Sequence, residues 1–517
     1  MRPSTHAARI AALMVLAAGL LGWLAGHTDV LFADGLRYLD QARKLDAGAL
    51  RDGLARSVDH PVYPLAIVAA HRRLGGEGPA AWQRAGQVAS VLAGVLLVVP
   101  LYLVAAELFG PGSAWLGTLL IYLTPRTGHA LADVLSEGTF LLFWTWGLYC
   151  ALRFLRDGRS TWLPPTVVFA ALAYLTRPEG LLLPGALVVS LGLMPLLRST
   201  RLNWPRWWAA VGLLVVGPAL IVGPYMASKG GLGTKPAVSR LLGTVPQSAP
   251  DAVERLRPLD PDQSTARTYL LAGRAVLGAL RDAVGTPLLP LGLLGLIGAW
   301  RVGGKPREWL LVGVVLSASG LALVRLHATG GYCTPRHALI PATLLLMAAG
   351  SGLDRALRSI AIPGRWVGLG EGRFQVGPAA WGAAILAIAA WSAPTALSHV
   401  NASFLGYKSA GAYLAAHAGP GEKVVDVTGW SLFYGRREGY TFADLLAAPG
   451  DPGVRYVVAR EAHLAGPWWY SARLRDLTAG LTPEKVFPEV ADPGRSKVLV
   501  YRLPDRVAAA PAGAIHQ

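Results

Sequence analysis

Long apolar stretches dominate this chain, and they limit its fold more than any other feature. A helix that crosses a bilayer needs roughly 20 mostly apolar residues, and about eleven segments approach that length. Since 53% of the residues are hydrophobic and only 15% are charged, the composition does not suit a water-facing surface. The sequence predicts an all-α polytopic membrane protein, a fold in which spans lie near residues 9–27, 84–106, 112–125, 137–155, 162–177, 180–197, 207–226, 285–300, 309–327, 337–354 and 379–398.

The first apolar run has two interpretations. It follows a short basic stretch and could be a cleaved signal peptide, but it is long enough to span a bilayer, and more spans follow. We therefore expect it to be retained as the first span. The stretch from Pro61 to Leu74 is shorter and is expected to be interfacial or re-entrant.

The basic residues lie between the apolar spans and predict an orientation. A net charge of +17 would suggest nucleic-acid binding in a soluble protein, but short loops rich in Lys and Arg are retained on the cytoplasmic side of a membrane. A cytoplasmic N-terminus places four basic loops inside, and these contain Arg153, Arg156, Arg159, Arg198, Arg201, Arg206, Arg301, Lys305, Arg307, Arg355, Arg358, Arg365 and Arg373. We expect a multi-pass protein of the inner (plasma) membrane. In this topology Cys150 and Cys333 fall on opposite sides and cannot pair.

The composition changes at about Asn401, where apolar runs shrink to strand length and charged residues become frequent. Residues 409–418 predict a short helix, and the Val- and Tyr-rich runs 423–427, 456–459 and 497–503 predict strands. We therefore expect a membrane domain over residues 1–400 and a small extracytoplasmic α/β domain over residues 401–517.

The loop after the first span carries the first candidate for chemistry. Asp34 stands at the predicted membrane boundary, and Tyr38 follows it at i+4, on the same face of a helix. Asp34 could simply cap this helix by accepting backbone N–H bonds. The alternative is a carboxylate that acts as a base or a ligand.

A second acidic pair precedes the fourth span, where Asp133 and Glu137 are also spaced i and i+4. A carboxylate within a membrane costs on the order of 2 to 3 kcal/mol on insertion scales, so Glu137 is a candidate functional residue. Alternatively, Glu137 stabilises the positive end of the helix dipole.

Two arginines fall on the same predicted face as these acids. Arg177 lies in the sequence LTRPEG, and Arg336 precedes a span. A guanidinium can hold a phosphate through two parallel N–H bonds. Arg177 could instead form a salt-bridged turn, and Arg336 could extend towards lipid headgroups.

These motifs together resemble the GT-C membrane glycosyltransferases, specifically bacterial relatives of the dolichyl-phosphate-mannose protein mannosyltransferases and of the lipid A aminoarabinose transferases (glycosyltransferase family 39-like). The resemblance covers roughly residues 9 to 400. It depends on the order and common face of Asp34, Tyr38, Ala42, the stretch Pro61 to Leu65, Ser136, Glu137, the stretch Thr176 to Gly180, and Arg336 before Leu339, Ile340 and Pro341. One position departs from the pattern, because many members have a second carboxylate where this chain has Gly35.

The resemblance implies eleven to thirteen helices and a donor sugar carried on a polyprenyl phosphate. It implies an inverting transfer in which Asp34 removes the proton of an acceptor hydroxyl, with Glu137 as a second catalytic carboxylate. Arg336, and less directly Arg177, would bind the donor phosphate. Four further residues are assigned to substrate binding: Tyr38, His60, Tyr63 and Asp133.

Other classes of function remain open from the sequence. A transporter or lipid-linked glycan flippase would also use charged residues in broken helices, but no inverted repeat is visible, and the charges gather at one face. A non-catalytic membrane subunit would not depend on Asp34. Trp468, Trp469 and Tyr470 could stack on a carbohydrate or form part of a core.

Cofactors are not expected. The eleven histidines are scattered, without the spacing of a transition-metal site, and no nucleotide-binding glycine motif is present. The family resemblance leaves open one divalent cation, held between Asp34, Glu137 and the donor phosphate. The expected partners are the lipid-linked donor, membrane lipids and an acceptor of unknown class.

Overall fold

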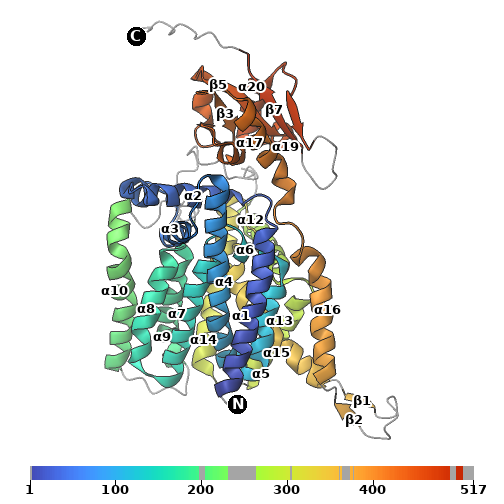
Figure 1. Ribbon diagram of the computed structural model, residues 1–517. Coiled ribbons are helices and arrows are strands. Elements are labelled where there is room, and N and C mark those ends of the chain that lie inside the picture. The colour runs from blue at the N-terminus through green and yellow to red at the C-terminus, as the bar shows by residue number, and fades with distance from the viewer. Residues whose placement is uncertain are drawn as a thin grey trace.

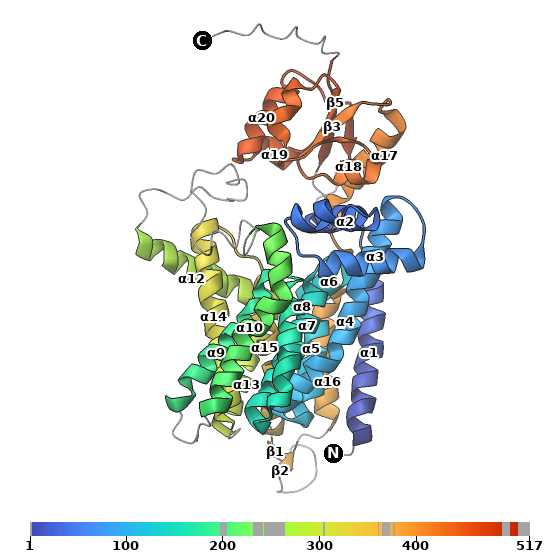
Figure 2. The same cartoon turned by 90° about the vertical axis from the view of Figure 1, so that its left-hand side faces the viewer.

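The computed structural model describes residues 3–196, 204–230, 241, 264–302, 305–359, 361–363, 373–375, 378–488 and 497–504. It contains a block of long helices with a small α/β domain above it (Figures 1 and 2). The block is built from α1 (Pro3–Gly26), α4 (Pro79–Phe109), α5 (Pro111–Leu123), α7 (Glu137–Asp157), α8 (Leu163–Tyr174), α9 (Leu182–Leu193), α10 (Trp204–Lys229), α13 (Leu288–Val302), α14 (Pro306–Gly330), α15 (Leu339–Ser359) and α16 (Pro378–Ala396).

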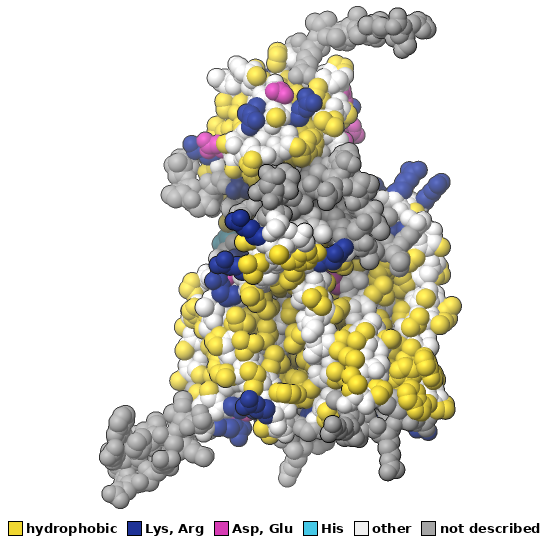
Figure 3. All heavy atoms as spheres, turned by 180° about the vertical axis from the view of Figure 1, so that it is seen from behind, with side chains coloured by type: hydrophobic (Ala, Val, Ile, Leu, Met, Phe, Trp, Pro, Cys, Tyr) yellow, Lys and Arg dark blue, Asp and Glu magenta, His cyan; other side chains and the backbone are white. Residues whose placement is uncertain are grey.

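Each of the eleven predicted spans coincides with one of these helices. Six helical stretches in the described residues are long and apolar enough to cross a membrane, and a seventh is formed if α12 (Thr265–Val284) and α13 count as one span bent by 96°. On the face seen in Figure 3, hydrophobic side chains predominate over the helical block, and Lys and Arg lie near its upper and lower ends. The protein is therefore a multi-pass membrane protein.

Helix α12 lies between the spans predicted at 207–226 and 285–300, and no element was predicted from the sequence there. Its apolar residues are interrupted by Arg267, Arg274 and Arg281, which recur every seventh residue and so share one face of the helix. This pattern lowers the hydropathy below that of a span. It suits a helix at the boundary between lipid and water.

Glycines allow the central helices to approach closely. A Cβ on Gly295 of α13 would lie 1.9 Å from the carbonyl oxygen of Ala348 on α15, and a Cβ on Gly117 of α5 would lie 2.6 Å from that of Met347. Because lipid tails are as apolar as leucine, packing of small residues drives the association of membrane helices. α15 therefore packs closely against both α13 and α5.

The upper end of the block carries short helices that run across it. These are α2 (Ala33–Asp46), η1 (Arg51–Ala55), α3 (Val62–Leu74) and α6 (Pro125–Ala132) (Figures 1 and 2). Helix α3 begins after Pro61, in the stretch expected to be interfacial or re-entrant. Cys150 and Cys333 are both free, as expected.

The C-terminal domain contains a five-stranded sheet in the order β4-β3-β5-β7-β6. β3 (Lys423–Asp426), β5 (Val454–Arg460) and β7 (Val498–Arg502) lie where strands were predicted, whereas the shorter edge strands β4 (Gly439–Tyr440) and β6 (Lys485–Phe487) were not. β3 pairs in parallel with β4 and β5, and β7 pairs antiparallel with β5 and β6. Helices α17 (Leu405–His417), α18 (Trp430–Gly435), α19 (Glu461–Ala465) and α20 (Trp469–Thr478) complete the domain.

Candidate active site

A large cavity of about 2480 Å³ lies between the upper face of the helical block and the C-terminal domain. Its lower wall comes from α2, the start of α4 and the segments before α9 and α15, and its upper wall comes from α18 and the loops around it. Five of the sequence-predicted site residues line this cavity: Asp34, Tyr38, Glu137, Arg177 and Arg336. Chain segments up to 300 residues apart are thus brought to one wall.

Asp34 is the second residue of α2, so it does not occupy the N-cap position that the simpler interpretation required. The N-cap is Phe32, whose side chain makes no capping bond. The Asp34 carboxylate accepts from Arg37 Nη2 at 3.0 Å through Oδ1 and from Arg336 Nη1 at 3.0 Å through Oδ2. Its side chain is 28% exposed. Asp34 is therefore held by two cations and still reaches the cavity.

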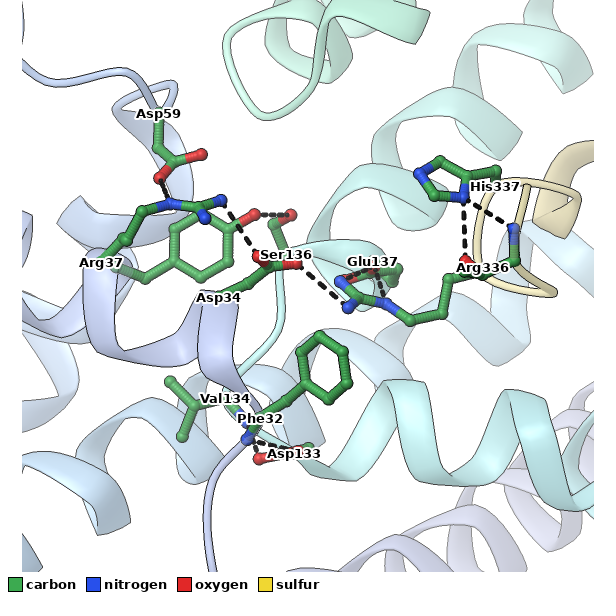
Figure 4. Close-up of polar contacts among 12 residues, drawn as sticks. Phe32, Asp34, Arg37, Asp59, Asp133, Val134, Ser136, Glu137, Arg336 and His337 are labelled. Atoms are coloured by element: carbon green, nitrogen blue, oxygen red, sulfur yellow. Dashed lines mark hydrogen bonds and ion pairs between the residues drawn. The ribbon is translucent and has the colours of Figure 1, made fainter. Parts of the chain in front are cut away.

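Arg336 connects the two predicted catalytic acids (Figure 4). Its Nε donates to Glu137 Oε1 at 2.7 Å, and its Nη2 contacts the same oxygen, while Nη1 reaches Asp34. The guanidinium carbon lies 4.4 Å from the centre of the Phe32 ring. Burial lowers the pKa of Arg336, but the charges of Glu137 and Asp34 raise it above its ordinary value. Arg336 is therefore a permanent cation at the centre of the site.

Glu137 also pairs with a second arginine, Arg177, through the same carboxylate oxygen that contacts Arg336. Arg177 Nη1 donates to Glu137 Oε1 at 2.9 Å, and Arg177 Nη2 donates to Glu179 at 2.8 Å. The Glu137 side chain is only 1% exposed, and its Oε2 has no hydrogen-bond partner among the described residues. A buried carboxylate that pairs with two arginines keeps both guanidiniums together beside the cavity.

Arg37, a partner of Asp34, and Asp59, a partner of Arg37, were not among the candidates from the sequence. Arg37 donates through Nε to Asp59 Oδ2 at 3.0 Å, and Asp59 is 1% exposed. Gln41 of α2 donates to the carbonyl oxygen of Gly53 at 2.7 Å, which holds the loop around Asp59 against α2. The i, i+3 spacing of Asp34 and Arg37 was visible in the sequence, but the long-range contact between Arg37 and Asp59 was not.

Of the four substrate-binding candidates, Tyr38 lines the cavity, whereas Tyr63, His60 and Asp133 are not among its lining residues. The Tyr38 hydroxyl contacts Ser136 Oγ at 2.9 Å, and its ring packs edge-on against buried Tyr63 at 5.1 Å. His60 packs edge-on against Tyr174 at 4.9 Å. For Tyr63, His60 and Asp133, a role in substrate binding stays a prediction.

Asp133 is a buried carboxylate surrounded by hydrogen-bond donors. Its Oδ2 accepts from the Phe32 amide at 3.0 Å and from Asn401 Nδ2 at 2.8 Å, and its Oδ1 accepts from the Val134 amide at 2.7 Å. Burial raises the pKa of Asp133 to about 6, while these hydrogen bonds and Arg336 act in the opposite direction. Asp133 therefore fixes the start of α2, two residues before Asp34.

The C-terminal domain holds the segment that leads into α2. Trp430 Nε1 donates to the Leu31 carbonyl oxygen at 2.9 Å, and the Leu31 amide donates to the Tyr434 hydroxyl at 3.1 Å. Asn401 Nδ2 also donates to the Val30 carbonyl oxygen at 2.8 Å. The position of Asp34 thus depends on a domain that begins more than 360 residues later in the chain.

The sequence left open whether the aromatic cluster of Trp468, Trp469 and Tyr470 belongs to a core or is available to a carbohydrate. Trp469 and Tyr470 pack partly against the core of the C-terminal domain, and both also line the cavity. Trp468 stacks on Tyr470 with ring centres 5.8 Å apart. The cluster is therefore both a part of the core and a part of the upper wall.

Known proteins match this chain in one segment by sequence and along most of its length by structure. The family model described as dolichyl-phosphate-mannose-protein mannosyltransferase matches residues 59–222. The structure of ArnT from Cupriavidus metallidurans bound to undecaprenyl phosphate is similar with a TM-score of 0.58 and 14% identity, over 96% of this chain and 98% of that chain. This chain has the GT-C membrane glycosyltransferase fold.

Two archaeal structures support the same fold. The Archaeoglobus fulgidus oligosaccharyltransferase in the apo form gives a TM-score of 0.59 at 12% identity, over 88% of this chain and 70% of that chain. The oligosaccharyltransferase AglB from the same organism, in complex with an inhibitory peptide and a dolichol-phosphate, gives 0.58 at 12% identity, over 89% and 70%. No curated protein sequence matches the chain. The resemblance inferred from the motifs is thus confirmed.

The structure explains the departure from the GT-C pattern at Gly35. A Cβ on Gly35 would lie 2.9 Å from the carbonyl oxygen of Val134 and 3.1 Å from the Val134 Cβ. Contacts this short leave no room for a side chain, so α2 can pack against the loop of Asp133 only with glycine at this position. The second carboxylate of the site is supplied by Glu137, through Arg336.

A divalent cation does not fit between the two acids as they are placed here. The Arg336 guanidinium already lies between them, with one nitrogen 3.0 Å from Asp34 and another 2.7 Å from Glu137. Within the described part of the chain, no group of three or more His, Cys, Asp or Glu side chains is arranged to hold a metal ion.

Proposed function

We propose that this protein is an inverting glycosyltransferase that moves a sugar from a polyprenyl phosphate to an acceptor hydroxyl on the extracytoplasmic face of the plasma membrane. The observation that carries the proposal is the position of Arg336, which joins the carboxylates of Asp34 and Glu137 at the wall of the cavity. Two similar structures support the donor class, because ArnT is bound to undecaprenyl phosphate and AglB is in complex with a dolichol-phosphate.

In the proposed reaction, Asp34 accepts the proton of the acceptor hydroxyl. The acceptor oxygen forms a bond to the anomeric carbon as the bond from that carbon to the phosphate oxygen breaks, so the configuration inverts in one step. The leaving phosphate gains negative charge. Arg336 and Arg177 are placed to stabilise it, because preorganised cations at a developing charge contribute strongly to catalysis.

The apolar part of the cavity suits the lipid portion of such a donor. Beside Arg336, the wall is formed by Leu323 and Leu326 of α14, by Ile340 and Pro341 of α15, and by Leu182 of α9. Burial of a prenyl chain contributes about 0.8 kcal/mol per CH₂ and would place its phosphate at the level of the arginines. The distribution of basic loops supports the orientation, because the lower end carries the loops that the positive-inside rule assigns to the cytoplasm.

The test is transfer of radiolabelled sugar in membranes loaded with polyprenyl-phosphate sugars, comparing the wild type with Asp34→Asn at equal expression. We expect a loss of about 100-fold or more, since general-base catalysis typically contributes 10²- to 10⁴-fold. Asp40→Asn is the matched control, because Asp40 is also on α2 but is 62% exposed and, among the described residues, forms an ion pair only with Lys44.

Unchanged transfer by Asp34→Asn would remove Asp34 from the mechanism. If the wild type transfers sugar from no lipid donor, a transporter or flippase becomes the better explanation. Thermal unfolding of both variants in detergent shows whether a loss of transfer is a loss of fold.

A further inference from the structure

Two arginines at the far end of α2 from Asp34 are not used by the proposed transfer. Arg43 lies on α2 and Arg436 follows α18, so they come from the lower and upper walls of the same cavity. Among the residues that the structure describes, neither forms an ion pair with a carboxylate, whereas Arg37, Arg177 and Arg336 each do. Arg43 and Arg436 therefore bring two positive charges to the cavity wall that no described carboxylate pairs with.

Arg43 is held rigidly by aromatic rings. Its guanidinium carbon lies 5.6 Å from the centre of the Trp82 ring and 5.1 Å from that of Phe433. Trp82 also stacks on His71, with ring centres 3.8 Å apart. Contact with ring faces leaves the N–H edge of a guanidinium available for an anion.

The environment of Arg43 does not favour its positive charge. Burial lowers its pKa, as does the charge of Arg436, and only Asp40 acts in the other direction. Asp40 is already paired with Lys44 at 2.6 Å. An anion that bound between Arg43 and Arg436 would remove this repulsion.

Arg436 adopts a backbone conformation that is unfavourable for a residue with a Cβ. Its φ of 51° lies in the left-handed region, which only Asn401 shares among the described residues other than glycine. The turn places its guanidinium against Gly78, where a Cβ would lie 1.8 Å from Arg436 Nη2. Such strain gathers at functional sites, and here it brings a second cation to the start of α4.

From this geometry we propose that Arg43 and Arg436 form a subsite for an anionic group, a phosphate or a carboxylate, on the acceptor. The inference rests on the proposed function, since it assigns a property to the acceptor of that reaction. Nine residues separate Asp34 from Arg43 along α2, which corresponds to roughly 13 Å at 1.5 Å per residue. An acceptor bound here would carry its charge about that distance from the hydroxyl that reacts, well away from the donor phosphate at Arg336.

The experiment is a binding titration of the purified full-length protein in nanodiscs of zwitterionic phosphatidylcholine. Inorganic pyrophosphate is the probe, the ionic strength is held constant, and thermal unfolding reports the apparent Kd. The variants are Arg43→Gln, Arg436→Gly and the double variant. Arg436→Gly also relieves the strained φ, so it is expected to fold at least as well as the wild type.

We expect the double variant to weaken pyrophosphate binding by at least about tenfold, because hydrogen bonds to a charged group are among the stronger ones. Arg72→Gln is the control of equal charge change, since Arg72 is 65% exposed and pairs with Asp46. It should change the apparent Kd less than twofold. Equal binding by the double variant and the wild type would overturn the proposal, as would a loss of binding seen only in Arg336→Gln.

A second arm distinguishes a lipid headgroup from an acceptor. The titration is repeated in nanodiscs that contain anionic phosphatidylglycerol. If this lipid competes with pyrophosphate in the wild type and not in the double variant, the subsite holds a headgroup, and the assignment to the acceptor is wrong. No sugar is transferred in this assay, so its outcome is independent of the Asp34→Asn result.

Discussion

Buried acids paired with arginine occur at both ends of the helical block, but in different settings. At the cavity end, Glu137 is 1% exposed, and its partner Arg336 is itself only 22% exposed. At the opposite end, Glu107 is 9% exposed, but its partner Arg156 is 50% exposed. Asp354 and Arg358 repeat the second pattern, with exposures of 12% and 71%.

This difference in the exposure of the arginine side chains distinguishes arginines at the candidate site from arginines at the membrane boundary. An exposed guanidinium keeps its hydration, so its ion pair contributes little to stability, and its long stem extends past the apolar region. A buried guanidinium has lost water and depends on the carboxylates around it. At Arg336, contacts with two acids and an aromatic ring replace most of the water around the guanidinium. These contacts hold the guanidinium in place for a further anion.

The largest effect is expected from Arg336→Gln compared with Arg358→Gln at the other end. Loss of one preorganised donor at a developing charge typically costs about 10²- to 10³-fold in rate, so transfer should fall by that amount in Arg336→Gln. Arg358→Gln should stay within about twofold of the wild type, because an exposed pair contributes under about 1 kcal/mol. The measurement is kcat/KM for sugar transfer.

Arg336→Lys sharpens this comparison, because it keeps the charge but loses the planar fork that reaches both acids. We expect a loss intermediate between the wild type and Arg336→Gln. Equal losses in Arg336→Gln and Arg358→Gln would show that the two ends do not differ in function.

A smaller effect is expected from Asn401→Ala, which removes the amide bonds to Val30 and Asp133. Asn401 touches no substrate in the proposed mechanism, so it is a positioning residue. A misplaced Asp34 should lower kcat by about 10- to 100-fold and leave the KM for the donor unchanged, since slight misplacement of reacting groups is costly. Trp430→Phe, which removes only the bond to Leu31, should give a smaller loss of the same kind. A change in KM alone would contradict a positioning role.

The smallest expected effect concerns pH. Burial raises the pKa of Asp133 to about 6 from an ordinary value of 3.8, so the folded protein binds a proton that the unfolded chain releases between these values. This contribution to stability is fully present below about pH 4 and is lost as the pH rises through 6. Thermal unfolding of Asp133→Asn should therefore depend less on pH between 4 and 6 than that of the wild type. An unchanged dependence would assign the titration to other groups.

The positions of membrane helices were predictable because a span requires a long apolar run, and such a run is a local property of the sequence. The same holds for the strands at 423–426, 454–460 and 498–502, which are short and rich in Val and Tyr. Helix α12 was not predicted because its arginines interrupt the apolar run. Their spacing of seven residues nevertheless suits an interfacial helix.

The sequence by itself determined the class of fold, the candidate acids and arginines, and their common face, because hydropathy and residue chemistry act locally. Only the tertiary structure decided which of these groups meet. Arg336 joins Asp34 to Glu137, Asp59 reaches Asp34 through Arg37, and Gly35 leaves room for the Val134 loop. The physical reason is that ion pairs and close contacts depend on distances of a few ångströms between segments far apart in the chain, and such distances are set by helix packing and by the C-terminal domain.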